Sequence, residues 1–166
     1  MKIMESSQGK PSIHKSSRHS KITGDFAENL ILYWLSKYGF ECAKVDHTGI
    51  DLLARNPVND ELMGISVKSR SRNEGKEGQY VHIPNDNFYK INKACEVFNC
   101  QPYVAIVIDE DNKIKAYILS IDRLLQYFPM GRTAVGWKMS KSWIEKYNSD
   151  NAIIKFEFEH KTKNWW

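Results

Sequence analysis

The chain has 166 residues, 42% of them hydrophobic and 27% charged, and a formal net charge of +4. This length and composition suit one soluble globular domain with a core large enough to fold alone. No apolar run is long enough to span a membrane, and the polar start of the chain lacks the apolar stretch of a secretory signal. Cys42, Cys95 and Cys100 show no CxxC spacing, so neither a zinc ribbon nor a disulfide framework is indicated, and we expect reduced thiols in a cytoplasmic protein.

The positive charge is concentrated at the N-terminus. Residues 1–21 contain five basic residues and one acidic residue, which gives +4 and leaves residues 22–166 neutral overall. We expect residues 1–21 to form a disordered basic arm and residues 22–166 to form a single domain. The arm either adds sequence-independent affinity for phosphate or is a solvated tail.

The first half of the domain reads as a helix followed by three strands. Thr23 can cap a helix that begins near Gly24, and Gly39 ends it. Alternating and apolar patterns predict the strands 40–45, 50–54 and 62–68, with a turn at 56–60 between the second and third.

The second half begins with a helix from Asn85 or Asp86 to Phe98. We expect a buried strand at 103–108, a turn at 109–112 and a partner strand at 114–119 to follow. A short helix that starts at Ser120 or Asp122 and runs through Phe128, and a strand at 152–158, are expected after them. Residues 129–150 give no readable pattern. This order predicts an α/β fold with a mixed central sheet flanked by helices.

Three residues in the first half are candidates for chemistry. Asp51 sits beside an otherwise apolar strand, where a divalent cation would be a strong partner for its carboxylate. Ser66 and Lys68 are two residues apart in a strand, so they project to the same face. A lysine beside an anionic cluster can orient water or stabilise negative charge on phosphate.

The succession of Glu28 on a helix, Asp51 after a glycine, and Ser66-Val-Lys68 on the next strand resembles the PD-(D/E)xK nuclease superfamily. The resemblance implies a restriction endonuclease-like αβββαβ core at about residues 22–119, with 120–166 as a C-terminal extension. It also implies catalytic roles for Glu28, Asp51, Ser66 and Lys68. In that superfamily the acids bind Mg²⁺, with Mn²⁺ as an alternative, and the lysine positions or activates the attacking water.

Ser66 departs from the superfamily pattern, because Asp or Glu is usual at this position. A neutral hydroxyl is a poor ligand for a hard cation, so the metal site should be weaker. Another glutamate could replace the missing acid, with Glu74, Glu77 and Glu96 as candidates. Alternatively, Glu28 and Asp51 suffice together with the backbone oxygen of Val67. In a third case the site is inactive and the fold only binds nucleic acid.

Cations follow the candidate site along the chain. Lys68, Arg70 and Arg72 alternate, with Lys76 shortly after. If the strand continues, we expect Arg70, Arg72 and Lys76 to contact a phosphate backbone. Otherwise they form a charged strand edge that discourages aggregation.

The leading hypothesis is therefore a Mg²⁺-dependent endonuclease that hydrolyses DNA, alone or as a homodimer. The alternative is a catalytically inactive nuclease-fold protein that binds nucleic acid or serves as an assembly module, and Ser66 is the residue that favours it. An α/β interaction domain with no nucleic-acid role is the third hypothesis. The four late tryptophans, Trp137, Trp143, Trp165 and Trp166, are expected to cover a core or an interface.

Overall fold

The computed structural model describes residues 14–73, 75–76 and 79–164. Its helices are α1 (His19–Lys37), α2 (Asn85–Phe98), α3 (Ile121–Tyr127) and α4 (Lys141–Asn148). Its strands are β1 (Glu41–Lys44), β2 (Leu52–Arg55), β3 (Leu62–Ser71), β4 (Val81–Pro84), β5 (Gln101–Glu110), β6 (Lys113–Ser120), β7 (Ala134–Trp137) and β8 (Ile154–Glu159).

The central sheet has six strands in the order β1-β2-β3-β5-β6-β8. All neighbours are antiparallel except β3 and β5, which pair in parallel. A parallel pair needs a crossover, and the segment with β4 and α2 provides it. The expected mixed sheet flanked by helices is thus confirmed.

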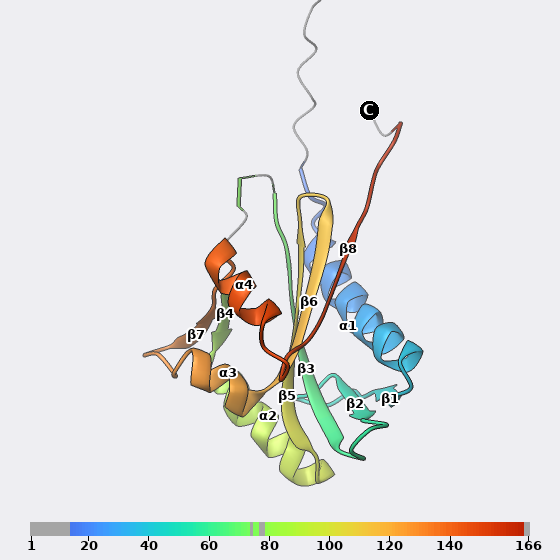
Figure 1. Ribbon diagram of the computed structural model, residues 1–166, viewed down its shortest axis with the longest axis vertical. Helices are drawn as coiled ribbons and strands as arrows, with labels where there is room; N and C mark the ends of the chain where they lie inside the picture. The colour runs from blue at the N-terminus through green and yellow to red at the C-terminus, as the bar shows by residue number, and fades with distance from the viewer. Residues whose placement is uncertain (1–13, 74, 77–78, 165–166) are drawn as a thin grey trace, which may run out of the picture.

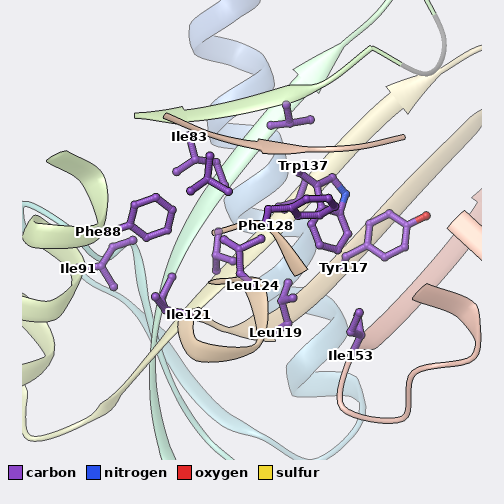
Figure 2. Packing of buried hydrophobic residues seen from close by; sticks show 14 of the residues in the cluster. Ile83, Phe88, Ile91, Tyr117, Leu119, Ile121, Leu124, Phe128, Trp137 and Ile153 are labelled. Carbon is purple, nitrogen blue, oxygen red and sulfur yellow. The ribbon is translucent and has the colours of Figure 1, made fainter. Parts of the chain in front are cut away.

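The two faces of this sheet are covered differently (Figure 1). α1 lies on one face, whereas α2, α3, α4 and the small sheet of β4 and β7 lie on the other. Each face has its own buried apolar cluster. Ile31 and Leu35 of α1 belong to the first, and Phe88 and Ile91 of α2 belong to the second. Figure 2 shows part of the second cluster, with Phe88 and Ile91 from α2 and Ile121 from α3 labelled.

The predicted start of the first helix is wrong. The helix begins at His19 rather than near Gly24, so residues 19–21 belong to α1 and not to an arm. The reason is visible at Thr23, whose hydroxyl donates to the carbonyl oxygen of His19 at 2.7 Å. This bond between residues four apart is made inside a helix, so Thr23 does not act as a cap. Residues 1–13 of the predicted arm lie outside the described residues.

Most other predicted elements are confirmed, with shifted ends. β5 runs to Glu110 and β6 starts at Lys113, so the turn between them is shorter than expected. The segment 129–150, which gave no pattern, contains β7 and α4. β4 and β7 have only four residues each and pair across about fifty residues of chain, so neither produces a local signal.

The aromatic residues of this segment are part of the core. Trp137 is fully buried and stacks on Tyr147 at a centroid distance of 3.9 Å, and Trp143 packs against the same cluster. Trp165 and Trp166 lie outside the described residues. The cysteines are free, with Cys95 buried and Cys42 and Cys100 half-buried. Within the described ranges, no helix has the length and apolar character needed to cross a membrane.

Candidate active site

The side chains of β3 alternate between the two faces of the sheet, and this alternation determines which residues can contact each other. Val67 packs against the cluster beneath α1. Gly64 faces α2, because a Cβ at this position would lie 2.7 Å from the Sγ of Cys95. Since residues two apart share a face, Ser66 and Lys68 also lie on the α2 side of the sheet. Ser66 is almost fully buried there, with 2% exposure, and Lys68 is half-buried.

Asp51 sits where β2 has not yet begun. Its amide donates to the carbonyl oxygen of Ile65 at 2.8 Å, and its carbonyl oxygen accepts from the amide of Val45 at 2.9 Å. The Asp51 carboxylate then accepts the amide N–H of Val67 at 2.6 Å. The backbone on both sides is therefore pinned, and the carboxylate is fixed at the edge of β3 next to the Ser66-Val67-Lys68 segment.

Asp51 and Lys68 interact electrostatically, and both side chains are partly buried. Burial raises the pKa of Asp51, and the nearby carboxylate of Glu28 raises it further, while the Val67 amide and the Lys68 amine oppose the shift. Burial lowers the pKa of Lys68, and the charge of Asp51 opposes that shift. The two groups therefore stabilise each other's charged forms in a place that disfavours charge.

Glu28 approaches Asp51 from α1, on the other face of the sheet. Its carboxylate forms an ion pair with Lys44 of β1, with an Nζ to Oε2 distance of 2.9 Å. This hydrogen bond is the main reason why the pKa of Lys44 is raised. Lys44, which the sequence patterns did not single out, thus holds Glu28 and also places a positive charge near Asp51.

A second group missed from the sequence lies at the start of α2. Asp86 and Lys90 are ion-paired at 2.7 Å, and both act on the pKa of Lys68, which Asp86 raises and Lys90 lowers. Asp86 is therefore an acid on the Lys68 side of the site. No local pattern pointed to it, because its position relative to Lys68 depends on how α2 crosses over β3.

Glu96, one of the three acids proposed as replacements, is not at this position. Glu96 is ten residues after Asp86 on the same helix, which places it about 15 Å further along the axis. Next to Glu96, Cys95 faces Gly64, four residues before Lys68 on β3. Glu74 and Glu77 lie outside the described residues.

The three cations beyond the site differ in exposure. β3 continues to Ser71, as required for Lys68 and Arg70 to share a face, and exposed Arg70 donates to the carbonyl oxygen of His82 on β4 at 3.3 Å. Arg72 is half-buried and donates to the carbonyl oxygen of Lys76 at 3.3 Å. Burial lowers the pKa of Arg72, and Arg70 lowers it further. Arg70 and Lys76 are thus open to a ligand, and Arg72 less so.

The groups around Asp51 suit a hard divalent cation. In a strand, the N–H and C=O of one residue point to the same edge, so the Val67 carbonyl points toward the side where its N–H meets Asp51. β2 pairs with β3 only as far as Ile65, which leaves this edge open beside Val67. The carboxylates of Asp51 and Glu28 repel each other, and a cation bound between them would offset this repulsion. Within the described residues, no group of three or more His, Cys, Asp or Glu side chains could hold a metal, so the site would depend on two carboxylates and a carbonyl.

The structure of Hjc, a Holliday junction resolvase from Archaeoglobus fulgidus, is similar to this chain, with a TM-score of 0.54 at 19% identity. The match covers 74% of this chain and 88% of Hjc. The fold is restriction endonuclease-like. A bacterial homing endonuclease also matches, with a TM-score of 0.47, 14% identity and coverage of 74% of this chain and 80% of the endonuclease. Comparisons with protein-family models and with curated proteins give no match.

Proposed function

We propose that this protein is a Mg²⁺-dependent endonuclease that hydrolyses phosphodiester bonds of DNA. The observation that carries the proposal is the Asp51 carboxylate, which is fixed to the Val67 amide and coupled to Glu28 on one side and to dehydrated Lys68 on the other. A structural aspartate at a strand end would need neither of these charged neighbours. The nuclease fold of Hjc supports the same reading.

In this proposal Asp51, Glu28 and the Val67 carbonyl would bind the metal. A bound Mg²⁺ or Mn²⁺ would polarise a phosphoryl oxygen and lower the pKa of a coordinated water. Glu28 would have to exchange its ion pair with Lys44 for the metal. Lys44 is exposed and Glu28 half-buried, and an ion pair near the surface is worth about 1 kcal/mol, so the exchange costs little.

Lys68 would act on the attacking water or on the negative charge that develops on the phosphate. Burial lowers its pKa, so its neutral form is reached at lower pH than in a solvated lysine. Asp86 would add negative charge on the α2 side and favour the charged form of the amine. Arg70 and Lys76, which are exposed, would contact the phosphates on either side of the cleaved bond.

Replacing Lys68 tests the assignment. We expect Lys68→Met to lower the rate of cleavage of plasmid DNA in Mg²⁺ by roughly 100-fold, the scale of a lost proton-transfer or charge-stabilising group. DNA affinity should change little, because one cation of several is removed. Lys37→Met, which removes the same charge from an exposed position at the end of α1, is the matched control and should cleave normally. Equal rates for Lys68→Met and the parent protein would contradict the proposed role.

The second candidate function, a nuclease-fold protein that binds DNA without cutting it, is favoured by Ser66. Here Ser66→Glu is informative, because it places a carboxylate on the same face as Lys68. For a weakened nuclease we expect Mg²⁺ binding to tighten by on the order of tenfold and cleavage to rise with it. The control is Ser66→Gln, which has the same size without the charge and separates the ligand effect from crowding at this buried position.

Comparing Ser66→Glu with Ser66→Gln has two other informative outcomes. If Asp86 already supplies the missing charge, the added carboxylate would repel it and cleavage should fall below that of Ser66→Gln. If cleavage is absent in the parent and in both variants, and DNA binding weakens only with Glu, the protein is a non-catalytic binder. Cleavage is measured by gel assay in Mg²⁺ and in Mn²⁺, and metal affinity by calorimetry without DNA.

A further inference from the structure

The small sheet of β4 and β7 has one face in the core and one face outside it. Val81 and Ile83 of β4, and Val135 and Trp137 of β7, are buried in the apolar cluster beneath the sheet. Figure 2 shows Ile83 and Trp137 on the core side of these two strands. By alternation, the residues between them project outward.

The outward face is built around Tyr80. His82 pairs with Gly136 across the two strands, and Tyr80 precedes β4 on the same side as His82. A Cβ at Gly136 would lie 3.3 Å from the ring carbon Cδ2 of Tyr80, so the ring rests against a strand that has no side chain there. Tyr80 is nevertheless 51% exposed. One side of the ring is therefore supported by β7, while much of the ring remains open to a ligand.

Aromatic rings and cations surround a hollow of about 500 Å³ at this place. Phe128 and Trp143 line it together with Tyr80, and Arg132 and Lys138 supply positive charge. The Lys138 ammonium lies 5.2 Å from the ring centroid of Trp143, 5.8 Å from that of Phe128 and 5.9 Å from that of Tyr80. Among the described residues, the lining contains no Asp or Glu. We call this feature the aromatic pocket.

Hydrogen bonds connect the aromatic pocket to the candidate active site along two routes. On the first, Arg70, two residues after Lys68, donates to the backbone of His82 at 3.3 Å. On the second, the Asn85 side chain donates to the carbonyl oxygen of Gly131 at 2.9 Å, and the Asn85 amide to that of Thr133 at 3.0 Å. Asn85 is followed directly by Asp86, which acts on Lys68. The pocket wall is thus fixed to the same helix start that faces the site.

We propose that the aromatic pocket binds an unpaired nucleobase of the DNA strand whose backbone passes Lys68 and Arg70. The proposal rests on the proposed function, and it names the form of DNA that the site prefers. An exposed aromatic ring stacks on any base, and cations beside it attract the phosphates on either side of that base. A base within a paired duplex is stacked on its neighbours and does not present its face, so the pocket favours bulges, flaps and single-stranded ends.

The experiment compares two DNA molecules that differ in one unpaired position. Both are labelled duplexes, and one carries a bulged fluorescent purine analogue. Affinity is measured by anisotropy without metal, so that cleavage plays no part. We expect Tyr80→Ala to lower the affinity for bulged DNA by roughly tenfold and to leave the affinity for the paired duplex unchanged. Stacking on the Tyr80 ring should quench the fluorescence of the bulged purine. Tyr80→Phe should retain both the affinity and this quenching, because it keeps the ring.

Tyr33→Ala is the matched control, since it removes a tyrosine of similar exposure, 59%, from α1 on the opposite face of the sheet. The pocket proposal is overturned if the parent protein binds both duplexes equally, or if Tyr80→Ala weakens both alike. It is also overturned if the acidic peptide poly-glutamate displaces the bulged DNA from the parent but not from Tyr80→Ala, because the pocket would then select negative charge rather than a base. If the parent cleaves paired DNA through Lys68 without preferring the bulge, only the pocket proposal fails. If the parent binds neither DNA, the proposed function fails as well.

Discussion

We expect Asp51→Asn to remove Mg²⁺-dependent cleavage and, at the same time, to make the protein more stable at neutral pH. The loss of cleavage should be roughly 100-fold or more, because a metal-bound carboxylate contributes several kcal/mol and each 1.4 kcal/mol is tenfold in rate. The amide oxygen of Asn can still accept the Val67 amide, so the backbone around the site should be preserved.

The gain in stability follows from the pKa of Asp51. Burial and the charge of Glu28 raise this pKa, so the folded protein binds the Asp51 proton more tightly than the unfolded chain does. The corresponding stability is present at low pH and is lost as the pH rises through the raised pKa. An uncharged Asn does not suffer this loss at neutral pH. We therefore expect the melting temperature of Asp51→Asn to be roughly 2–4 °C higher than that of the parent, the effect of about 1 kcal/mol.

Calorimetry at several pH values tests this prediction. The difference between Asp51→Asn and the parent should vanish below the ordinary Asp pKa of 3.8, where Asp51 is protonated in both states. Added Mg²⁺ should raise the melting temperature of the parent only, because ligand binding to the folded state stabilises it. Asp46→Asn, in the same loop but exposed, is the control and should change neither property. A variant that melts at a lower temperature than the parent at pH 7 would contradict the electrostatic account.

The second large effect is expected at Gly49. This residue has a φ of +111°, and a Cβ there would lie 2.3 Å from the carbonyl oxygen of Lys90 in α2. Gly49→Ala therefore combines an unfavourable backbone conformation with a clash against helix backbone that cannot rotate away. We expect a loss of about 3 kcal/mol or more of unfolding free energy, measured by urea denaturation. Because Asp51 is two residues away, the remaining folded protein should also lose cleavage.

Gly24→Ala is the matched control for this change. Gly24 lies inside α1, and nothing lies within 4 Å of the position that its Cβ would occupy. The same substitution there should raise stability by about 0.5–1 kcal/mol, because alanine favours helix. If both variants were destabilised alike, the contact between Gly49 and α2 would not be the cause.

How much could be predicted from the sequence depends on the range of the interaction. Ser66 and Lys68 share a face because of the strand period alone, which needs no knowledge of the rest of the chain. The prediction of where the first helix starts was wrong because of the Thr23 hydroxyl. This hydroxyl can bond either a backbone amide or a backbone carbonyl, and only the conformation of the preceding turn decides which.

The missing parts of the site depend on long-range pairing. Asp86 acts on the pKa of Lys68 only because β3 and β5 pair in parallel and α2 crosses between them on the Lys68 side. Likewise, nothing near Tyr80 indicates that Gly136 will lie beneath its ring, because that contact depends on the pairing of β4 with β7. Local patterns identify candidate residues, whereas the tertiary pairing determines their partners.

The connectivity of β4 and β7 also has a consequence for folding. α1, β1, β2 and β3 follow one another with short connections, so the segment that carries Glu28, Asp51 and Lys68 closes only small loops. β4 instead pairs with β7, about fifty residues later in the chain, and closing this longer loop costs more chain entropy than the short connections do. We therefore expect amide hydrogens of β4 and β7 to exchange faster than those of β3 and β5. A molecule that opens there would lose its aromatic pocket while the strand that carries Lys68 remained protected.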